Sequence, residues 1–192
     1  MTKRPPATLH ATRARALAGL LAAALSIAAS RRAMAFEDQL HLGAGAGTAG
    51  FVAAGQQAGT AAAAYLAYGW TDAFDLRFET LFVDPPDPSG ERGARTLHRI
   101  LLGGLTYKVD VLEWIPYIGV LVGHYSFGAA RPPDVGASGV GVALPAGLDW
   151  APTRELGLGV QLGYHGSLAA LPSFGAAPYF SAALRAEYRW GW

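Results

Sequence analysis

One pair of residues has the types and the spacing that nucleophilic catalysis uses. His124 and Ser126 are separated by one residue, so on a β-strand their side chains share a face. A serine nucleophile needs a histidine base and an acid that orients the base. No glutamate follows until Glu155, much further along the chain, and Asp134 lies in a segment rich in proline and glycine. We therefore expect no catalytic residue, and interpret the pair as polar residues near the rim of a larger structure.

Other motifs of enzyme and cofactor sites are absent from the sequence. It contains no phosphate-binding loop, no zinc motif and no nucleophile elbow. The segments rich in proline and glycine also lack the spacing of acidic residues that calcium loops use. We therefore expect no metal site, no cofactor-binding residue and no cofactor.

Charged residues instead alternate with apolar residues along two segments of the chain. One segment begins at Phe74, and the other ends the chain at Trp192. A period of two is typical of a β-strand whose two faces differ. Each segment is therefore predicted to be a strand with one apolar face and one face of charged and small residues. The charged residues of the two segments are Asp75, Arg77, Glu79, Arg185, Glu187 and Arg189.

The composition excludes several classes of protein. The chain has 192 residues, which is enough for one domain with a packed core. It has no cysteine, which excludes disulfides, thiolate metal sites, a cysteine nucleophile and a lipoprotein anchor. Hydrophobic residues make up 52% of the chain, so we expect it to be folded rather than disordered.

The first 35 residues have the three parts of a secretory signal peptide. A basic start is followed by an apolar run, Leu17 to Ala29, and by the small-residue site Ala33-Met34-Ala35. The run is short for a membrane-spanning helix, which needs roughly 20 residues. We predict cleavage near Ala35, giving a signal peptide at 1–35 and a barrel domain at 36–192. Of the 15 basic residues six lie in the peptide, so the mature domain keeps 9 against 14 acidic residues. This net charge of −5 argues against a nucleic-acid partner.

Eight alternating or glycine-spaced segments follow the signal peptide, and the connections between them alternate in length. Outer-membrane barrels have short turns on the periplasmic side and longer loops outside. The sequence therefore predicts an all-β fold, an eight-stranded antiparallel up-and-down transmembrane β-barrel. Short turns are expected at 71–73, 110–114 and 151–155, and longer loops at 48–58, 84–95, 128–139 and 166–178.

The face opposite the apolar one carries glycine, alanine and serine as well as the charges. The lumen of an eight-stranded barrel is just wide enough for side chains, so small residues suit an inward face. We therefore place the charges inside, together with His41, Gln161 and His165. Buried charges must pair. We expect Asp75, Arg77 and Glu79 to pair with Arg185 and Arg189 across the lumen. The predicted lumen ionic network, which plugs the barrel, consists of Asp75, Arg77, Glu79, Arg185, Glu187 and Arg189.

Some positions are assigned less fully by the pattern. Arg99 and Lys108 lie toward strand ends, where we expect them to be solvated. The outward face is not determined for the fourth segment, at about 96–109, or for the fifth. Between Ile115 and Phe127 both faces are apolar, so the alternation does not show which one points outward.

Aromatic residues gather near the short turns and at the end of the chain. Rings of this kind favour the membrane–water interface, where transmembrane barrels carry aromatic girdles. The alternative is the core of a soluble β-sandwich, in which clustering at one end of the strands has no purpose. The predicted aromatic girdle consists of Trp70, Phe74, Trp114, Trp150, Tyr188, Trp190 and Trp192.

Two stretches resemble those of a known family. Trp190-Gly191-Trp192 resembles the aromatic-x-aromatic signal that ends bacterial outer-membrane proteins, and WIPYIGVLVGHYSFG (114–128) resembles a strand of the small OmpA/OmpX/OmpW-like eight-stranded barrels. The resemblance implies the outer membrane of a Gram-negative bacterium and contact with its lipid and lipopolysaccharide. It also implies that the barrel-assembly machinery recognises the last strand. We expect a monomer.

We interpret the chain as a structural or surface-interaction outer-membrane barrel with a plugged, ion-paired lumen, and not as an enzyme. The first alternative is a small OmpW-like channel for hydrophobic solutes. The second is a lipid A-modifying enzyme, because barrel-type lipid A deacylases carry a His-x-Ser similar to His124 and Ser126. In that family an asparagine follows and a glutamate lies further on, whereas Phe127 follows here. A soluble periplasmic barrel is the remaining alternative.

Overall fold

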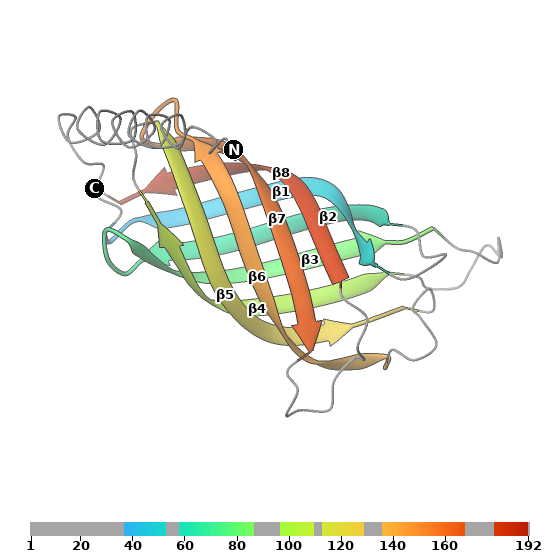
Figure 1. The fold of residues 1–192 in the computed structure, drawn as a ribbon. Helices are drawn as coiled ribbons and strands as arrows, with labels where there is room; N and C mark the ends of the chain where they lie inside the picture. Colours follow the sequence, from blue (N-terminus) through green and yellow to red (C-terminus); the bar gives the residue numbers. More distant parts are fainter. Residues whose placement is uncertain are drawn as a thin grey trace, which may run out of the picture. The chain divides into compact units, whose positions relative to one another are not determined.

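The alternating segments form eight antiparallel strands in the computed structural model, and these strands close into a barrel (Figure 1). The strands are β1 (Leu40–Phe51), β2 (Gly59–Gly69), β3 (Phe74–Asp84), β4 (His98–Lys108), β5 (Trp114–Ser126), β6 (Ser138–Trp150), β7 (Leu156–Ser167) and β8 (Tyr179–Trp190). The predicted fold class is confirmed. The structure describes residues 37–52, 58–86, 97–109, 113–128, 136–167 and 179–191, so the predicted signal peptide and Trp192 lie outside the described residues.

Each strand pairs with the next one along the chain, and β8 pairs with β1 to close the sheet. The closing register runs from Leu40 opposite Trp190 to Phe51 opposite Tyr179, so β8 covers the whole length of β1. A sheet edge exposed to lipid would leave its backbone donors and acceptors without partners. Tyr188 and Trp190 are thus part of the strand that closes the barrel.

The connections alternate in length, as the sequence predicts. The β2–β3, β4–β5 and β6–β7 turns are short and lie at the end of the barrel where β1 begins and β8 ends. In the first of these turns, the backbone N–H of Trp70 donates to the carbonyl of Phe74 and the Thr71 hydroxyl accepts from the N–H of Phe74. Several strands extend into predicted connections. β1 continues to Phe51, β5 begins at Trp114, β6 begins at Ser138 and β7 continues to Ser167.

The structure determines the orientation of β5. Ile115, Tyr117, Leu121 and Tyr125 point inward and are buried, whereas the alternate positions are outward and mostly exposed. The sequence pattern left this strand open because both of its faces are apolar. One face meets the interior of the barrel, and the other forms part of its apolar outer surface.

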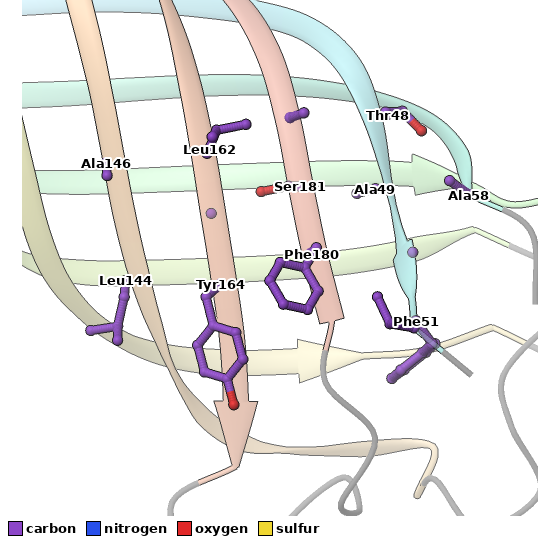
Figure 2. Close-up of a pocket in the computed structure, with 14 residues that line it drawn as sticks. Thr48, Ala49, Phe51, Ala58, Leu144, Ala146, Leu162, Tyr164, Phe180 and Ser181 are labelled. Carbon is purple, nitrogen blue, oxygen red and sulfur yellow. The ribbon is translucent and has the colours of Figure 1, made fainter. Parts of the chain in front are cut away.

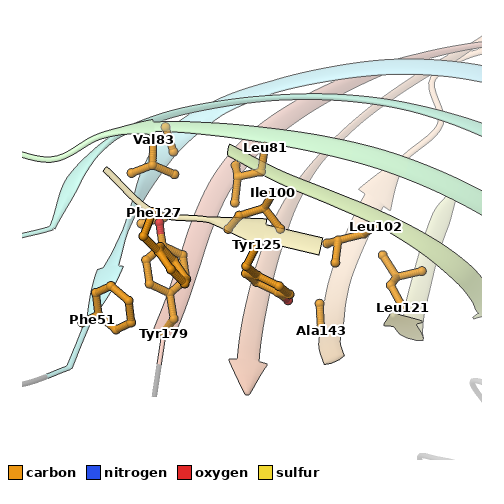
Figure 3. Packing of buried hydrophobic residues seen from close by; sticks show 12 residues of the cluster. Phe51, Leu81, Val83, Ile100, Leu102, Leu121, Tyr125, Phe127, Ala143 and Tyr179 are labelled. Atoms are coloured by element: carbon orange, nitrogen blue, oxygen red, sulfur yellow. The ribbon is translucent and has the colours of Figure 1, made fainter. Parts of the chain in front are cut away.

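The interior is divided into two halves of different chemistry. The half near the long loops holds an apolar and aromatic cluster to which β1–β6 and β8 contribute (Figure 3). The half near the short turns holds the charged side chains. The sequence pattern predicts a lumen lined by polar and small residues, so the apolar half was not expected. The main apolar residues of this cluster are Phe51, Leu81, Val83, Ile100, Leu102, Leu121, Tyr125, Phe127 and Tyr179.

Inward glycines make room for the largest interior side chains. A Cβ at Gly43 would overlap the ring of Tyr65, and a Cβ at Gly147 would overlap the ring of Tyr117. Both tyrosines are buried. The frequent glycines of the inward faces thus reflect how tightly the narrow interior is filled.

Candidate functional site

The candidate site is the charged half of the lumen, in which Glu187 of β8 lies at the centre of one group. Its Oε1 accepts a hydrogen bond of 2.6 Å from Nε of Arg189 and lies 3.1 Å from Nδ1 of His41. Its Oε2 accepts hydrogen bonds of 2.8 Å from Arg185 and from the hydroxyl of Tyr65. Glu187 therefore joins β8 to β1 and to β2 through a fully paired carboxylate.

Arg185 extends this group toward β5, β6 and β7. Its guanidinium forms an ion pair with Asp149 at 3.2 Å and donates to the Tyr117 hydroxyl and to Oε1 of Gln161. The cation also lies 4.4 Å from the ring centre of Tyr65 and 4.6 Å from that of Tyr117. Hydrogen bonds and cation–π contacts together compensate for removing this charge from water.

Arg77 and Glu79 of β3 join the group through a neutral side chain. The two residues form an ion pair of 2.7 Å along their own strand. Gln161 accepts a hydrogen bond of 2.8 Å from Arg77 and donates one of 3.2 Å to Glu79. Because Gln161 also accepts from Arg185, its amide links the charges of β3 to those of β8 across the lumen.

This geometry differs from the predicted pairing. Among the described residues, the ion pairs do not include a direct bridge between a charge of β3 and Arg185 or Arg189. Residues two apart on a strand share a face, so Arg77–Glu79, Arg185–Glu187 and Glu187–Arg189 pair along their own strands. The six predicted residues all point inward and are buried.

Lys108 was expected to be solvated, and this prediction is wrong. Lys108 is inward on β4 and buried, and its ammonium forms an ion pair with Asp75 of β3. The same ammonium lies 3.1 Å from Nδ1 of His41. The position is near a strand end, but the alternation places its side chain inside the barrel, where Asp75 needs a cation. Arg99, by contrast, points outward and is exposed.

The site contains residues that the sequence analysis did not assign to the network. Asp149, Lys108 and Gln161 provide charges or hydrogen bonds, and Tyr65 and Tyr117 provide rings over the guanidinium groups. Gln161 was predicted to point inward but was not assigned to the network, and Asp149 could have been found from its place on the glycine-rich inward face of β6. With them the buried charges of this half balance. The cations are Arg77, Lys108, Arg185 and Arg189, and the anions are Asp75, Glu79, Asp149 and Glu187.

Three polar side chains, those of Tyr125, His165 and Ser181, lie between the charged group and the long-loop end, beside the apolar cluster. Nε2 of His165 lies 3.0 Å from the Ser181 hydroxyl, and Nδ1 lies 3.1 Å from the Tyr125 hydroxyl. The ring of Tyr179 packs against His165 edge to face, with centroids 5.4 Å apart. These contacts satisfy both nitrogens of a buried imidazole and continue the packing toward the loop end.

The described residues predicted to form the aromatic girdle are exposed at the short-turn end. Trp114 and Trp150 lie opposite each other in the β5–β6 register, with ring centroids 6.5 Å apart. Phe74 packs on the ring of Tyr107, and Tyr188 on that of Trp190. Trp70 lies in the β2–β3 turn and is also exposed.

An apolar groove of about 590 Å³ lies where β6, β7, β8 and β1 approach the long-loop end (Figure 2). The exposed side chains along it include Leu144, Leu162, Tyr164 and Phe180. Small residues such as Ala146, Gly163 and Ala182 also line it. The groove is separate from the charged half of the lumen.

His124 and Ser126 are on the outward face of β5, His124 exposed and Ser126 half-buried. The outward faces of β4, β5 and β6 carry no acidic residue in the described part of the chain that could orient His124. Within the described residues, no group of three or more histidine, aspartate or glutamate side chains could hold a metal ion. The same part of the chain contains no helix long and apolar enough to cross a membrane.

The closed barrel, its alternating connections and its apolar outer surface define the fold of the small eight-stranded outer-membrane barrels. The N-terminal β-barrel domain of OprF from Pseudomonas aeruginosa has a similar structure, with a TM-score of 0.60 and 11% identity over 80% of this chain and 98% of that chain. Neisserial surface protein A gives a TM-score of 0.57 and 11% identity over 78% of this chain and 95% of that one. OprG from Pseudomonas aeruginosa gives a TM-score of 0.52 and 11% identity over 81% of this chain and 97% of that one. No family model matches the sequence, and no curated protein matches it.

Proposed function

We propose that this protein is a structural or surface-interaction barrel of the bacterial outer membrane whose lumen is plugged. The observation that carries the proposal is the contrast between the two surfaces of the wall. Eight buried charges of balanced sign face the lumen, whereas large apolar side chains are exposed on the outward faces of all the strands. In water this arrangement would expose an apolar surface far larger than a soluble monomer carries. In a bilayer the same surface faces lipid.

The plug has two layers. Near the short turns, Arg185, Gln161 and Glu187 join the walls of the barrel through hydrogen bonds. Near the long loops, the rings of Phe51, Phe127 and Tyr179 pack together, with Phe51 and Tyr179 centroids 4.9 Å apart. A pathway for ions would have to disrupt both layers, so we infer a barrel that does not conduct in its resting state.

Fractionation of cells that express the full chain tests the proposed location. The protein should be in the outer-membrane fraction, with an amino terminus near residue 36. Its band on a gel should shift between unheated and boiled samples, because a closed barrel resists detergent until it is heated. A protein recovered from the periplasmic soluble fraction would contradict the proposal.

A small channel for hydrophobic solutes remains the second candidate, and the apolar groove favours it. The groove lies next to the apolar half of the lumen. Phe51 lines the groove and also packs in the apolar cluster inside the barrel. A solute could enter there from the loop end without meeting the charged layer. Swelling of vesicles that contain the protein, measured with small apolar and polar solutes, separates the candidates. Uptake of the apolar solutes alone would favour the channel.

A further inference from the structure

Arg99 differs from the other basic residues of the barrel. Among the described residues it is the one lysine or arginine whose side chain lies on the outward face of a strand. The others lie in the lumen, apart from Arg154 in the β6–β7 turn. None of the ion pairs among the described residues includes Arg99, although Asp84 is on the outward face of the neighbouring strand. An exposed cation thus stands at the edge of an apolar surface.

Three further donor side chains lie on the same outward surface as Arg99, toward β5 and β6. The register places Arg99 directly opposite Ser126 of β5, and Ser126 directly opposite Ser138 of β6. His124 precedes Ser126 by two residues and shares its face. Side chains directly opposite on one face of a sheet are roughly 5 Å apart at Cβ. Arg99, His124, Ser126 and Ser138 therefore form one outward patch, called here the outer patch.

The outer patch and the tryptophans lie at opposite edges of the apolar band on the outer surface. On β5 the chain runs from Trp114, at the short-turn end, to Ser126. At about 3.4 Å per residue and a tilt of about 40°, this segment spans roughly 30 Å along the barrel axis. The apolar band of such barrels is about 25 Å tall, so the outer patch is at the level of the lipid headgroups. Below it, Leu101, Val120 and Val122 form an exposed apolar strip.

The chemistry of the outer patch matches a phosphate group. A guanidinium binds two phosphate oxygens through its planar fork, and the hydroxyl and imidazole groups beside it can each donate one further hydrogen bond. A fatty acyl chain would extend from that phosphate along the apolar strip. We propose that Arg99, His124, Ser126 and Ser138 bind a phosphate group of the phosphorylated glycolipid of the outer leaflet. This site rests on the proposed membrane location and gives His124 and Ser126 a binding role instead of a catalytic one.

Native mass spectrometry of the folded protein in detergent, titrated with lipid A, tests the site. The variant Arg99→Gln should bind bisphosphorylated lipid A about tenfold more weakly than the wild type, and the double variant Ser126→Ala, Ser138→Ala should also bind it more weakly. Arg154→Gln is the matched control, because it removes an exposed arginine at the opposite end of the barrel. It should bind like the wild type. Dephosphorylated lipid A should not distinguish Arg99→Gln from the wild type.

Several results would overturn the assignment. Equal binding of phosphorylated lipid A by the wild type and Arg99→Gln would show that the outer patch does not hold the phosphate. Displacement of lipid A by millimolar inorganic phosphate would indicate a site for free anions, and equal retention of phosphatidylglycerol would indicate a site for any anionic lipid. The gel shift on boiling should persist in Arg99→Gln, which would show that the variant still folds into a closed barrel. A loss of lipid A binding would then concern the outer patch and not the proposed function. A wild type that does not enter membranes would refute the function itself.

Discussion

The hydroxyl of Tyr65 donates a hydrogen bond of 2.8 Å to Glu187, although strand β1 lies between their strands. The register places Gly43 opposite Tyr65 on one side and opposite Glu187 on the other. Because Gly43 has no side chain, the tyrosine ring lies across β1 and reaches β8. The guanidinium groups of Arg77 and Arg185 lie 4.0 Å and 4.4 Å from the centre of the same ring.

Replacing Gly43 by alanine should displace the Tyr65 ring, because the added methyl would overlap it. We expect the free energy of unfolding to fall by about 1–3 kcal/mol, the usual cost of overpacking. Urea unfolding in lipid vesicles, followed by tryptophan fluorescence, measures the change. Gly103→Ala is the control, since its methyl would meet the outward ring of Phe78 at 3.2 Å, where the ring can move into lipid. Equal stability of Gly43→Ala and the wild type would contradict the tight packing inferred for this position.

Replacing Lys108 by alanine should leave the carboxylate of Asp75 buried without its cation. Loss of one partner from a buried ion pair costs about 3–5 kcal/mol, and less where water enters. Arg154→Ala, which removes an exposed charge in a turn, should change stability by no more than about 0.5 kcal/mol. The same unfolding measurement compares the two variants. If both had the same small effect, Lys108 would be solvated, as its place near a strand end suggested.

The sequence was sufficient to predict the number of strands, their order and, except for β4 and β5, which face of each strand points inward. Period-two alternation of Asp75, Arg77 and Glu79 with apolar residues is a local signal, and so is the alternation of turn lengths. The pairing inside the lumen could not be predicted in the same way. It depends on which side chains meet across the barrel, and therefore on strand register and tilt. Gln161 and Tyr65 have no charge at neutral pH, so a search for paired charges passes over both.

The two halves of the lumen illustrate the same limit. Leu121 and Tyr125 lie on a strand with two apolar faces, so the alternation contained no information on which face is inward. Which face of β5 points inward follows from its pairing with β4 and β6, and this pairing is a property of the whole sheet. The sequence therefore predicted the charged half of the interior from its amphipathic strands, and missed the apolar half.

Deleting Trp190 to Trp192 should impair assembly in the outer membrane. Trp190 pairs with Leu40 at the end of the closing register and packs on Tyr188, so the deletion shortens the closing strand. It also removes the sequence that resembles the assembly signal. Surface labelling of intact cells and the gel shift on boiling measure the folded fraction. An internal control, Trp150→Phe, should assemble normally. Wild-type amounts of folded protein after the deletion would show that the terminal aromatics are dispensable.

The variants His124→Ala and Ser126→Ala should leave the acylation of cellular lipid A unchanged. Both residues point outward, and the outward faces of the neighbouring described strands carry no acid to orient the histidine. Mass spectrometry of lipid A from cells that express each variant checks the expectation. An acyl chain that is removed only when both residues are intact would identify the protein as a lipid-modifying enzyme. It would also replace the binding role proposed for the outer patch.

We propose that the lumen is closed by its own side chains, and single-channel recording in planar bilayers tests this most directly. The wild type should be silent, because Arg185 joins Glu187, Asp149, Gln161 and Tyr117 across the lumen. Arg185→Ala should leak, and Gln161→Ala should show the same trend in a variant that loses no charge. Arg154→Ala, at the outside of the barrel, should be silent. Steady, large conductance of the wild type would contradict the account.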